Sequence, residues 1–337
     1  MIAFSRSIKE LDIMIVKRPF SFLIASIIVA SQLLNASDNN VDKTNQSSKE
    51  VKLPDFKIRL EKSDLRARKF DPETYSTECK KYISLVAAEE TFTGSKESLR
   101  YRLFTPKPNI SKKVPLVIFL HGYGDQNENA ENIQLRHPQC MTFISPENQK
   151  KAPCFFMAPR LNGGKHWGGV IETYEDGMPQ MAAFRVDKPT DTQVTLVELI
   201  SKLIKDNPGI DPERIYLTGL SSGGSGCFSI AYNFPGHFAG LIPVCAGHPR
   251  LLDQTKKTHK LAIWAFVNRN DEEEVRKACG LILDKYKALG GEVHYSTYTD
   301  QGVGGHSAWN WAYAEPDLIP WLFKQKRIKV KDVPAAW

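Results

Sequence analysis

The chain has 337 residues, of which 42% are hydrophobic and 25% are charged, and its formal net charge is +7. This is an ordinary globular composition, so disorder along the whole chain is excluded, and the length suits one large α/β domain or two small ones. The basic residues are spread along the sequence, with the densest cluster at Lys324 to Lys331. Because a nucleic-acid-binding surface needs Arg and Lys gathered on one face, we expect no nucleic-acid partner.

Residues 1–36 follow the order of a secretory signal peptide. A basic stretch that ends at Arg18 precedes an apolar run from Phe20 to Leu34, and a polar segment follows. Polar residues interrupt the apolar run, so it is weak for a membrane span, which needs roughly 20 apolar residues. Cleavage after Ala36 or Ala30 would release a secreted or periplasmic protein. An uncleaved N-terminal anchor is the alternative, and it would provide the only membrane contact that we expect.

Residues 37–80 are polar and charged, and we interpret them as a linker and N-terminal extension. From about residue 98 onward, short β-rich runs alternate with segments of helical periodicity. No repeat and no internal linker interrupts this alternation. We therefore predict one folded domain over residues 81–337.

Seven short runs are predicted to form strands, and several of them are continuously apolar, as in strands buried on both faces of a sheet. Helical spacing marks two helices between them: one begins at Asp191 and ends before Pro208, and the other follows Asp271 and ends at Gly290. The alternation predicts an α/β fold with a mostly parallel central sheet and helices on both faces. The predicted strands cover residues 99–104, 116–120, 155–158, 215–218, 241–244, 261–267 and 293–298.

An exported chain with six cysteines allows up to three disulfides. Three of the six lie in apolar stretches, where a free cysteine behaves as a small buried hydrophobe, and the other three are better disulfide candidates. The buried set is Cys154, Cys227 and Cys245, and the disulfide candidates are Cys79, Cys140 and Cys279. No two cysteines have CxxC spacing, and no group of His and Cys has the spacing of zinc ligands, so we expect no metal.

The segment Gly219-Leu220-Ser221-Ser222-Gly223 is a GxSxG motif at the end of an apolar strand. Residues that suit a helix follow it, which is the setting of a nucleophile elbow. The sharp turn leaves no room for side chains on either side of the serine, and Gly219 and Gly223 supply that room. The motif by itself arises often by chance, but its setting predicts that Ser221 is an exposed nucleophile.

A serine hydroxyl of ordinary pKa needs a base, and in this arrangement an acid and then a histidine follow the serine along the chain. His306 lies in a glycine-rich loop after the last predicted strand, and Asp271 follows the preceding strand after a short turn. We predict that His306 is the general base and that Asp271 orients it. His294, inside an alternating strand, is the rival for the base, and Glu272 and Glu273 are rivals for the acid.

An acyl-transfer reaction also needs hydrogen-bond donors aimed at the developing oxyanion. The backbone N–H of Ser222, the residue after the nucleophile, is the first predicted donor. The second is the N–H of Tyr123 in His121-Gly122-Tyr123-Gly124, an HGxG motif at the end of an apolar strand. We interpret His121 as a structural residue that braces this loop by hydrogen bonds, with no part in proton transfer.

Two tryptophans, Trp167 and Trp309, are candidates for the wall of a substrate pocket. Isolated tryptophans belong more often to the core, so a core position stays open for both.

Five stretches occur in the order expected of one known family. They are Leu99-Arg-Tyr-Arg-Leu-Phe-Thr-Pro, Pro115-Leu-Val-Ile-Phe-Leu-His-Gly, Asp211-Pro-Glu-Arg-Ile-Tyr-Leu-Thr-Gly-Leu-Ser, Phe234-Pro-Gly-His-Phe-Ala-Gly and Gly305-His-Ser-Ala-Trp-Asn. From about Leu99 to Arg327 the chain thus resembles the secreted esterases of the α/β-hydrolase superfamily, specifically the polyhydroxybutyrate depolymerase and feruloyl esterase type, including members labelled predicted peptidases.

The resemblance implies an α/β-hydrolase catalytic domain over residues 81–337 that cleaves ester or peptide bonds without a cofactor. Two departures stand out. Val267-Asn268 occupies the place where the family usually has His-Gly, and Pro159-Arg160 occupies the place where Pro-Gln is common. Neither departure removes a catalytic group, but the first shortens or reshapes the loop that holds Asp271.

The sequence therefore predicts a serine hydrolase that acts on a small-molecule or polymeric carboxylic ester. A serine peptidase of the prolyl-oligopeptidase type uses the same groups, but it normally carries a large N-terminal β-propeller, which roughly 60 residues cannot form. A catalytically inactive binding protein is the third hypothesis, because a fold alone does not prove activity. The presence of all three residue types of a triad argues against that hypothesis.

Overall fold

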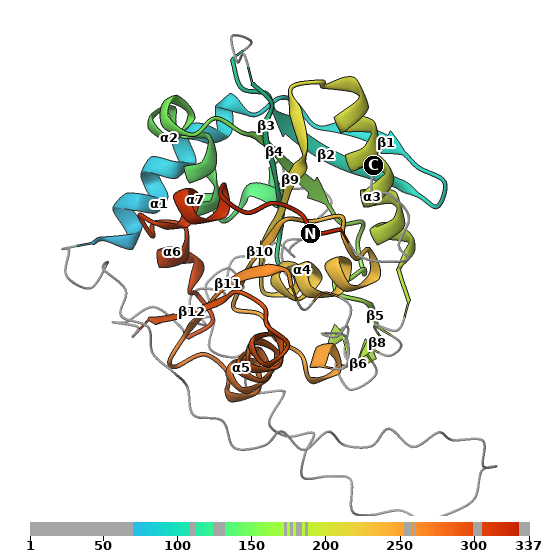
Figure 1. Cartoon of the computed structure of the whole chain (residues 1–337), viewed down its shortest axis with the longest axis vertical. Coiled ribbons are helices and arrows are strands. Elements are labelled where there is room, and N and C mark those ends of the chain that lie inside the picture. Colours follow the sequence, from blue (N-terminus) through green and yellow to red (C-terminus); the bar gives the residue numbers. More distant parts are fainter. Residues whose placement is uncertain are drawn as a thin grey trace, which may run out of the picture. The chain divides into compact units, whose positions relative to one another are not determined.

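The computed structural model describes residues 70–107, 112–123, 132–171, 174–175, 178–179, 184–185, 188–252, 258, 260–298 and 305–329 (Figure 1). The predicted signal peptide, residues 1–36, lies outside the described residues. Among the residues that are described, no helix combines the length and the apolar character that a membrane span requires.

In the described part of the chain, eight strands form the central sheet, in the order β1-β2-β4-β3-β9-β10-β11-β12. β2 pairs antiparallel with both of its neighbours, whereas every pair from β4 to β12 is parallel. The strands are β1 (Glu90–Thr93), β2 (Ser98–Phe104), β3 (Val114–Leu120), β4 (Phe155–Arg160), β9 (Ile210–Leu220), β10 (Gly240–Val244), β11 (Ala262–Asn268) and β12 (Val293–Tyr298). Two short pairs lie apart from this sheet, namely β5 (Val170–Ile171) with β8 (Phe184–Arg185) and β6 (Tyr174–Glu175) with β7 (Met178–Pro179).

Successive side chains of a strand point to opposite faces, and β3 shows the two cores that result. Leu116, Ile118 and Leu120 join the cluster that packs against α3 (Asp191–Asp206), α4 (Ser222–Asn233) and α5 (Glu273–Ala288). Val117 and Phe119 join the cluster on the other face, with α1 (Pro72–Lys81), the 3-10 helix η7 (Pro138–Ile144), α6 (Trp309–Ala312) and α7 (Leu318–Leu322). Helices thus cover both faces of a mostly parallel sheet, which confirms the predicted fold class (Figure 1).

Both predicted helices are present, and local features mark the start of the first and the end of the second. At α3 the Thr190 side chain accepts a hydrogen bond from the N–H of Gln193, and the Gln193 side chain accepts one from the N–H of Thr190, which completes a capping box. α5 begins at Glu273 and ends at Ala288, just before Gly290 with its φ of 87°. Each of the seven predicted strands has a counterpart in the sheet, and β9 is longer than predicted because it starts at Ile210. The remaining short helices are η4 (Tyr82–Leu85), η6 (Ile133–Leu135) and α2 (Pro146–Lys151).

The folded domain begins before the predicted boundary at residue 81. Residues 37–80 were predicted to be a polar linker and extension, but helix α1 occupies Pro72–Lys81, with the Asp71 carboxylate accepting hydrogen bonds from the first turn. Cys79 is buried in the second core, and the Tyr75 hydroxyl donates to the Tyr313 carbonyl over 2.7 Å. Helix α1 could not be predicted from its sequence, because most of its residues are polar and its apolar periodicity is therefore weak.

All six cysteines are free and buried. The prediction of disulfides at Cys79, Cys140 and Cys279 therefore does not hold in this structure. Cys79 and Cys140 belong to one hydrophobic core and Cys279 to the other, so these residues pack in the interior as the remaining cysteines do.

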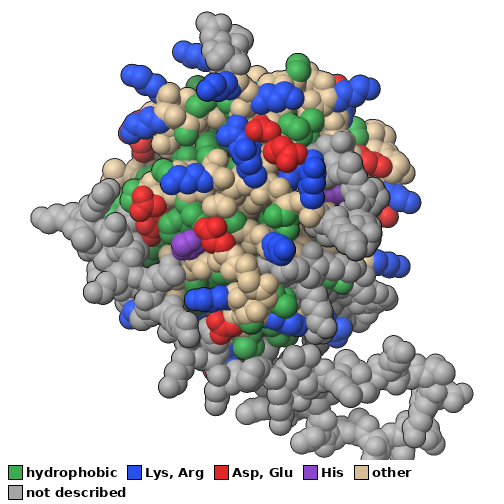
Figure 2. All heavy atoms as spheres, viewed as in Figure 1, with side chains coloured by type: hydrophobic (Ala, Val, Ile, Leu, Met, Phe, Trp, Pro, Cys, Tyr) green, Lys and Arg blue, Asp and Glu red, His purple; other side chains and the backbone are tan. Residues whose placement is uncertain are grey.

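The surface side chains show how the basic residues are distributed. On the visible face of Figure 2, Lys and Arg lie dispersed, with Asp and Glu between them. Many of the acids pair locally, such as Glu147 with Lys151 on α2 and Glu273 with Lys277 on α5. The absence of a nucleic-acid partner stays a prediction.

Candidate active site

Ser221 lies in the sharp turn between β9 and α4. Its backbone has φ 54° and ψ −119°, a conformation that non-glycine residues rarely adopt and that marks functional turns. A Cβ atom on Gly223 would lie 2.0 Å from the Leu120 carbonyl oxygen, and one on Gly219 would lie 2.6 Å from the Gly223 carbonyl carbon. Only glycine fits at these two positions, so the motif builds the strained turn that holds Ser221 at the end of the strand.

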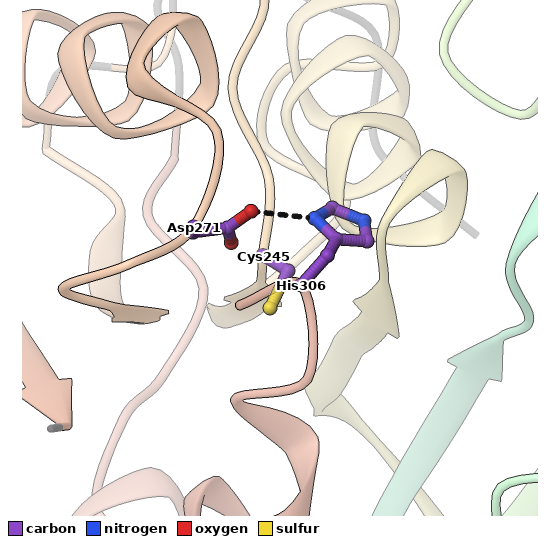
Figure 3. Close-up of side chains that lie close together, drawn as sticks. All are labelled: Cys245, Asp271 and His306. Atoms are coloured by element: carbon purple, nitrogen blue, oxygen red, sulfur yellow. Dashed lines mark hydrogen bonds and ion pairs between the residues drawn. The ribbon is translucent and has the colours of Figure 1, made fainter. Parts of the chain in front are cut away.

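Asp271 and His306 form a hydrogen-bonded pair (Figure 3). The His306 Nδ1 atom lies 2.8 Å from Asp271 Oδ1, and the backbone N–H of Glu272 donates to the same oxygen over 2.8 Å. The Asp271 side chain is fully buried, whereas 31% of the His306 side chain is exposed. Glu272, Glu273 and Glu274 are all exposed, so the buried acid that meets the imidazole is Asp271.

The pKa of His306 is raised above its ordinary value of 6.5. Burial opposes the charged imidazolium and is the largest single effect, but the hydrogen bond from the ring to Asp271 and the negative charge of that carboxylate together outweigh it, and Glu272 adds a smaller attraction. The pair therefore stabilises the imidazolium, which is the form that a histidine takes after it accepts a proton.

A close approach of two loops makes this pair possible. A Cβ atom on Gly305 would lie only 2.0 Å from the carbonyl oxygen of Asn270, so no larger residue fits beside the Asp271 loop. A second contact lies two residues away along each segment, where the Asn268 amide donates to the Ser307 hydroxyl over 3.1 Å. Asn268, one of the departures from the family pattern, is fully buried, and its hydrogen bond to Ser307 links the end of β11 to the loop after β12.

The serine turn and the acid–histidine pair meet at one edge of the sheet. The N–H of Ser221 donates to the Val244 carbonyl over 2.9 Å, and the next residue is Cys245. Cys245 Sγ, an Asp271 carboxylate oxygen and a His306 ring nitrogen all lie within 4.8 Å of one another (Figure 3). Because the carboxyl ends of parallel strands share one edge, β9, β10, β11 and the loop after β12 bring these groups together.

Cys245 is the site residue that the sequence analysis missed, since it was interpreted as a core cysteine. It is fully buried, but its φ is 48° and it follows β10 directly. Its position at the carboxyl end of β10, the strand beside β9, could have indicated in the sequence that Cys245 lies near the nucleophile. By residue type, Cys245, Asp271 and His306 are possible metal ligands. Burial, and after it the charge of Asp271, raise the pKa of the Cys245 thiol well above its ordinary value.

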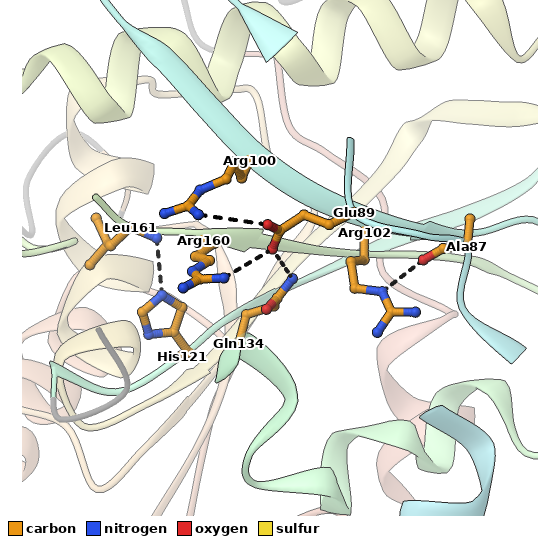
Figure 4. A network of polar contacts seen from close by, with 8 residues as sticks. All are labelled: Ala87, Glu89, Arg100, Arg102, His121, Gln134, Arg160 and Leu161. Carbon is orange, nitrogen blue, oxygen red and sulfur yellow. Dashed lines mark hydrogen bonds and ion pairs between the residues drawn. The ribbon is translucent and has the colours of Figure 1, made fainter. Parts of the chain in front are cut away.

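His121 braces the loop that carries the HGxG motif (Figure 4). Its Nε2 atom accepts a hydrogen bond from the N–H of Leu161 over 3.0 Å, so its Nδ1 atom carries the proton and donates to the Gly122 carbonyl over 2.8 Å. Both ring nitrogens are committed to the backbone, as the predicted structural role of His121 requires. Tyr123 follows in the same loop, and its ring centroid lies 6.2 Å from that of His166.

The second departure from the family pattern, Arg160, belongs to an ion-pair network beside this loop (Figure 4). Arg160 lies at the end of β4 and contacts Glu89 over 3.4 Å, and Arg100 contacts the same carboxylate over 3.8 Å. The Gln134 amide also donates to Glu89 over 3.0 Å. Arg160 is therefore held by a carboxylate from the segment before β1, and its neighbour Leu161 holds His121.

The predicted oxyanion donors occupy positions that suit the role. Ser222 is the first residue of α4, where helical N–H groups have no intrahelical acceptor and the helix dipole favours negative charge. Tyr123 lies at the beginning of the loop after β3, the strand beside β9. Their function as donors stays a prediction.

The two tryptophans differ in position. Trp167 is fully buried in the first core, and a Cβ atom on Gly226 of α4 would lie 2.5 Å from its Cβ, so it packs in the interior instead of lining a pocket. Trp309 is partly buried, and its ring centroid lies 5.8 Å from that of His306 and 4.9 Å from that of His137. Trp309 thus stays a candidate for contact with substrate.

A family model for phospholipases and carboxylesterases matches residues 107–267. The matched segment includes the His121 loop and Ser221 and ends just before the turn that leads to Asp271. No curated protein sequence matches the chain.

Several solved structures share the fold. A thermostable esterase is 29% identical with a TM-score of 0.62, and the match covers 73% of this chain and 64% of that one. An acylaminoacyl peptidase bound to Z-Gly-Gly-Phe-chloromethyl ketone is 16% identical with a TM-score of 0.51, covering 73% of this chain and 42% of the peptidase. A ferulic acid esterase is 15% identical with a TM-score of 0.50, covering 71% of this chain and 98% of the esterase. The last two likenesses are likenesses of fold alone.

Proposed function

We propose that this chain, which has the α/β-hydrolase fold, is a serine hydrolase that cleaves carboxylic esters through an acyl-enzyme on Ser221. The observation that carries the proposal is the hydrogen bond between buried Asp271 and partly exposed His306, at the sheet edge where Ser221 occupies its strained turn. The substrate is a small-molecule or polymeric ester, and the reaction uses no cofactor.

The reaction proceeds in two halves. The Ser221 hydroxyl oxygen attacks the ester carbonyl carbon while His306 takes the hydroxyl proton, and the N–H groups of Ser222 and Tyr123 stabilise the resulting oxyanion. The tetrahedral intermediate then expels the alcohol, which receives the proton from His306, and leaves an acyl group on Ser221. A water molecule attacks this acyl group while His306 takes its proton, and His306 then returns that proton to the Ser221 oxygen as the carboxylic acid departs.

Asp271 acts on His306 and not on the substrate. Its carboxylate holds the Nδ1 proton, so the opposite ring nitrogen, Nε2, is left to accept a proton from Ser221. Its negative charge also stabilises the imidazolium that forms in each half of the reaction.

Ester cleavage is favoured over peptide cleavage by two observations. The matching family model describes phospholipases and carboxylesterases, and the solved structure at 29% identity is that of an esterase. The acylaminoacyl peptidase shares only the fold, and the present chain spans 42% of its length. We also propose that residues 1–36 direct export to the periplasm or the medium, which fractionation of cells expressing the full chain would test.

Labelling with a fluorophosphonate probe tests the proposal. The wild-type chain is expected to react at its nucleophilic serine, and Ser221→Ala is expected to lose both the label and the turnover of p-nitrophenyl acetate. Ser201→Ala serves as the matched control for labelling, because it removes a serine hydroxyl on α3 that donates to the Val197 carbonyl. Full turnover by Ser221→Ala would exclude the mechanism, and an unlabelled, inactive wild-type protein would favour the inactive binding protein.

A further inference from the structure

The carboxylate of Asp271 has its two oxygens in different surroundings. Oδ1 accepts hydrogen bonds from His306 Nδ1 and from the Glu272 N–H. Oδ2 is buried and has no assigned hydrogen-bond partner among the described residues, but the Cys245 side chain is close enough for hydrogen bonding to Asp271 to contribute to its raised pKa. A buried carboxylate oxygen without a donor costs free energy, so a further donor to Oδ2 would stabilise the carboxylate in this orientation.

The Cys245 thiol is the polar group that lies beside this carboxylate. Its Sγ atom lies within 4.8 Å of a carboxylate oxygen of Asp271 and of a ring nitrogen of His306 (Figure 3). The Ala308 N–H donates to Sγ over 3.1 Å, so the sulfur already serves as an acceptor and its own proton is available for donation. The thiol stays protonated because burial, and after it the charge of Asp271, raise its pKa well above the ordinary value.

The backbone holds Cys245 in this place. Val244 accepts the hydrogen bond from the Ser221 N–H, and the N–H of Cys245 donates to the Phe266 carbonyl over 2.8 Å. The φ of 48° at Cys245 is a left-handed conformation that side-chain-bearing residues rarely adopt, and it turns the chain away from β10 at this point. Val244 and Cys245 together thus connect the nucleophile turn, the end of β11 and, through Ala308, the segment after His306.

We propose that Cys245 is a positioning residue whose thiol donates a hydrogen bond to Asp271 Oδ2 and fixes the carboxylate in the plane that His306 requires. The proposal rests on the proposed function, since it assigns Asp271 to the orientation of His306. Without the thiol, the carboxylate is held only through Oδ1, and the imidazole is oriented less precisely.

The test compares three substitutions that differ in whether a donor remains. Cys245→Ala removes the donor, and Cys245→Ser replaces it with a hydroxyl of similar reach. We expect Cys245→Ala to lower kcat on p-nitrophenyl acetate by roughly tenfold to a hundredfold, with KM nearly unchanged, because only the orientation of the base is disturbed.

Cys245→Ser should restore most of kcat. Cys245→Gly also lacks the donor and is relieved of strain at the positive φ, so it supplies a folded variant if Cys245→Ala is unstable.

Two further variants distinguish this role from alternatives. Cys154→Ala removes a buried thiol that donates to the Phe143 carbonyl, and it should keep wild-type kcat. Tyr295→Phe removes a buried hydroxyl that has no hydrogen-bond partner among the described residues and that feels the charge of Asp271. This variant should also keep wild-type kcat. A wild-type kcat in folded Cys245→Ala or Cys245→Gly would overturn the proposal, as would a Cys245→Ser variant as slow as Cys245→Ala. Fluorophosphonate labelling of each variant, beside unlabelled Ser221→Ala, keeps a failure of this proposal distinct from a failure of the proposed function.

Discussion

At the scale of single residues, the pair of Asp271 and His306 determines how the site responds to pH. His306 accepts a proton from Ser221 only when its ring is neutral, and Asp271 favours the charged ring. The same contact that stabilises the imidazolium during the reaction therefore raises the pH below which the free enzyme is inactive.

The pH profile of kcat/KM should show this directly. As the pH falls through the raised pKa of His306, the ring becomes protonated and activity is lost, so the acid limb should lie above 6.5, the ordinary pKa of histidine. In Asp271→Asn only the smaller attraction of Glu272 is left to oppose burial, which lowers the pKa of His306, so the acid limb of the residual activity should move to lower pH. Titration of kcat/KM with a p-nitrophenyl ester measures both limbs, and an unshifted limb in Asp271→Asn would contradict the assigned pair.

Substitution of each acid in the run that begins at Asp271 should separate the buried residue from its exposed neighbours. Asp271→Asn is expected to lower kcat by roughly a thousandfold or more, with KM nearly unchanged, because the amide can hold the imidazole in the wrong tautomer. Gln at Glu272, Glu273 or Glu274 should cost little, because these side chains are exposed. Measurement of kcat for the four single variants would contradict the assignment if a glutamate variant were the crippled one.

At the scale of secondary-structure elements, the site depends on how closely loops approach. The GxSxG turn joins β9 to α4 only because Gly219 and Gly223 leave room for the backbone of neighbouring segments. In the same way, Gly305 lets the loop after β12 lie against the turn that follows β11. The 2.8 Å hydrogen bond between Asp271 and His306 is thus a product of loop packing as much as of side-chain chemistry.

Gly305→Ala should therefore damage activity more than stability. The new methyl group would overlap the Asn270 carbonyl and force the two loops apart, and a displacement of about 1 Å at a reacting group can cost roughly a hundredfold in rate. The matched control is Gly209→Ala, whose methyl group would make an ordinary contact of 3.7 Å with Phe155. Turnover and thermal melts of both variants measure the effect, and wild-type kcat in Gly305→Ala would show that the loops do not need this approach.

At the scale of the whole molecule, the two hydrophobic cores hold the sheet without covalent cross-links. The six cysteines are distributed over both cores and all are free. Burial raises the pKa of Cys79 to about 11 and that of Cys154 to about 12, so both remain thiols at neutral pH. Since the thiolate is the species that reacts, these buried thiols are protected chemically as well as sterically.

The purified chain should accordingly contain six free thiols. Alkylation under denaturing conditions without a reductant, followed by intact mass measurement, is expected to add six alkyl groups, and a reductant should leave the melting temperature unchanged. Fewer than six groups together with a lower melting temperature in reductant would show that disulfides form in the exported protein, as the sequence analysis expected for Cys79, Cys140 and Cys279.

The sequence by itself determined the fold class and most of the site's members. Continuous apolar runs such as Leu116 to Leu120 specify buried parallel strands, and a GxSxG motif at a strand end specifies a turn that only glycines permit. Such features are local, since they depend on residues a few positions apart. Helix α1 was not predicted, because its sequence is mostly polar. It packs mainly through Tyr75 and Cys79, and these two residues form no apolar periodicity.

Only the tertiary structure decided which distant residues meet. Four acidic residues follow β11 in succession, and burial against His306 singles out Asp271. Cys245 shares its apolar surroundings with other core cysteines, and its place beside Asp271 arises from the pairing of β10 with β9 and β11. Trp167, in turn, lies in the core because α4 packs over it. Contacts between residues far apart in the chain follow from the order of strands in the sheet, and that order is a property of the folded molecule and of no single segment.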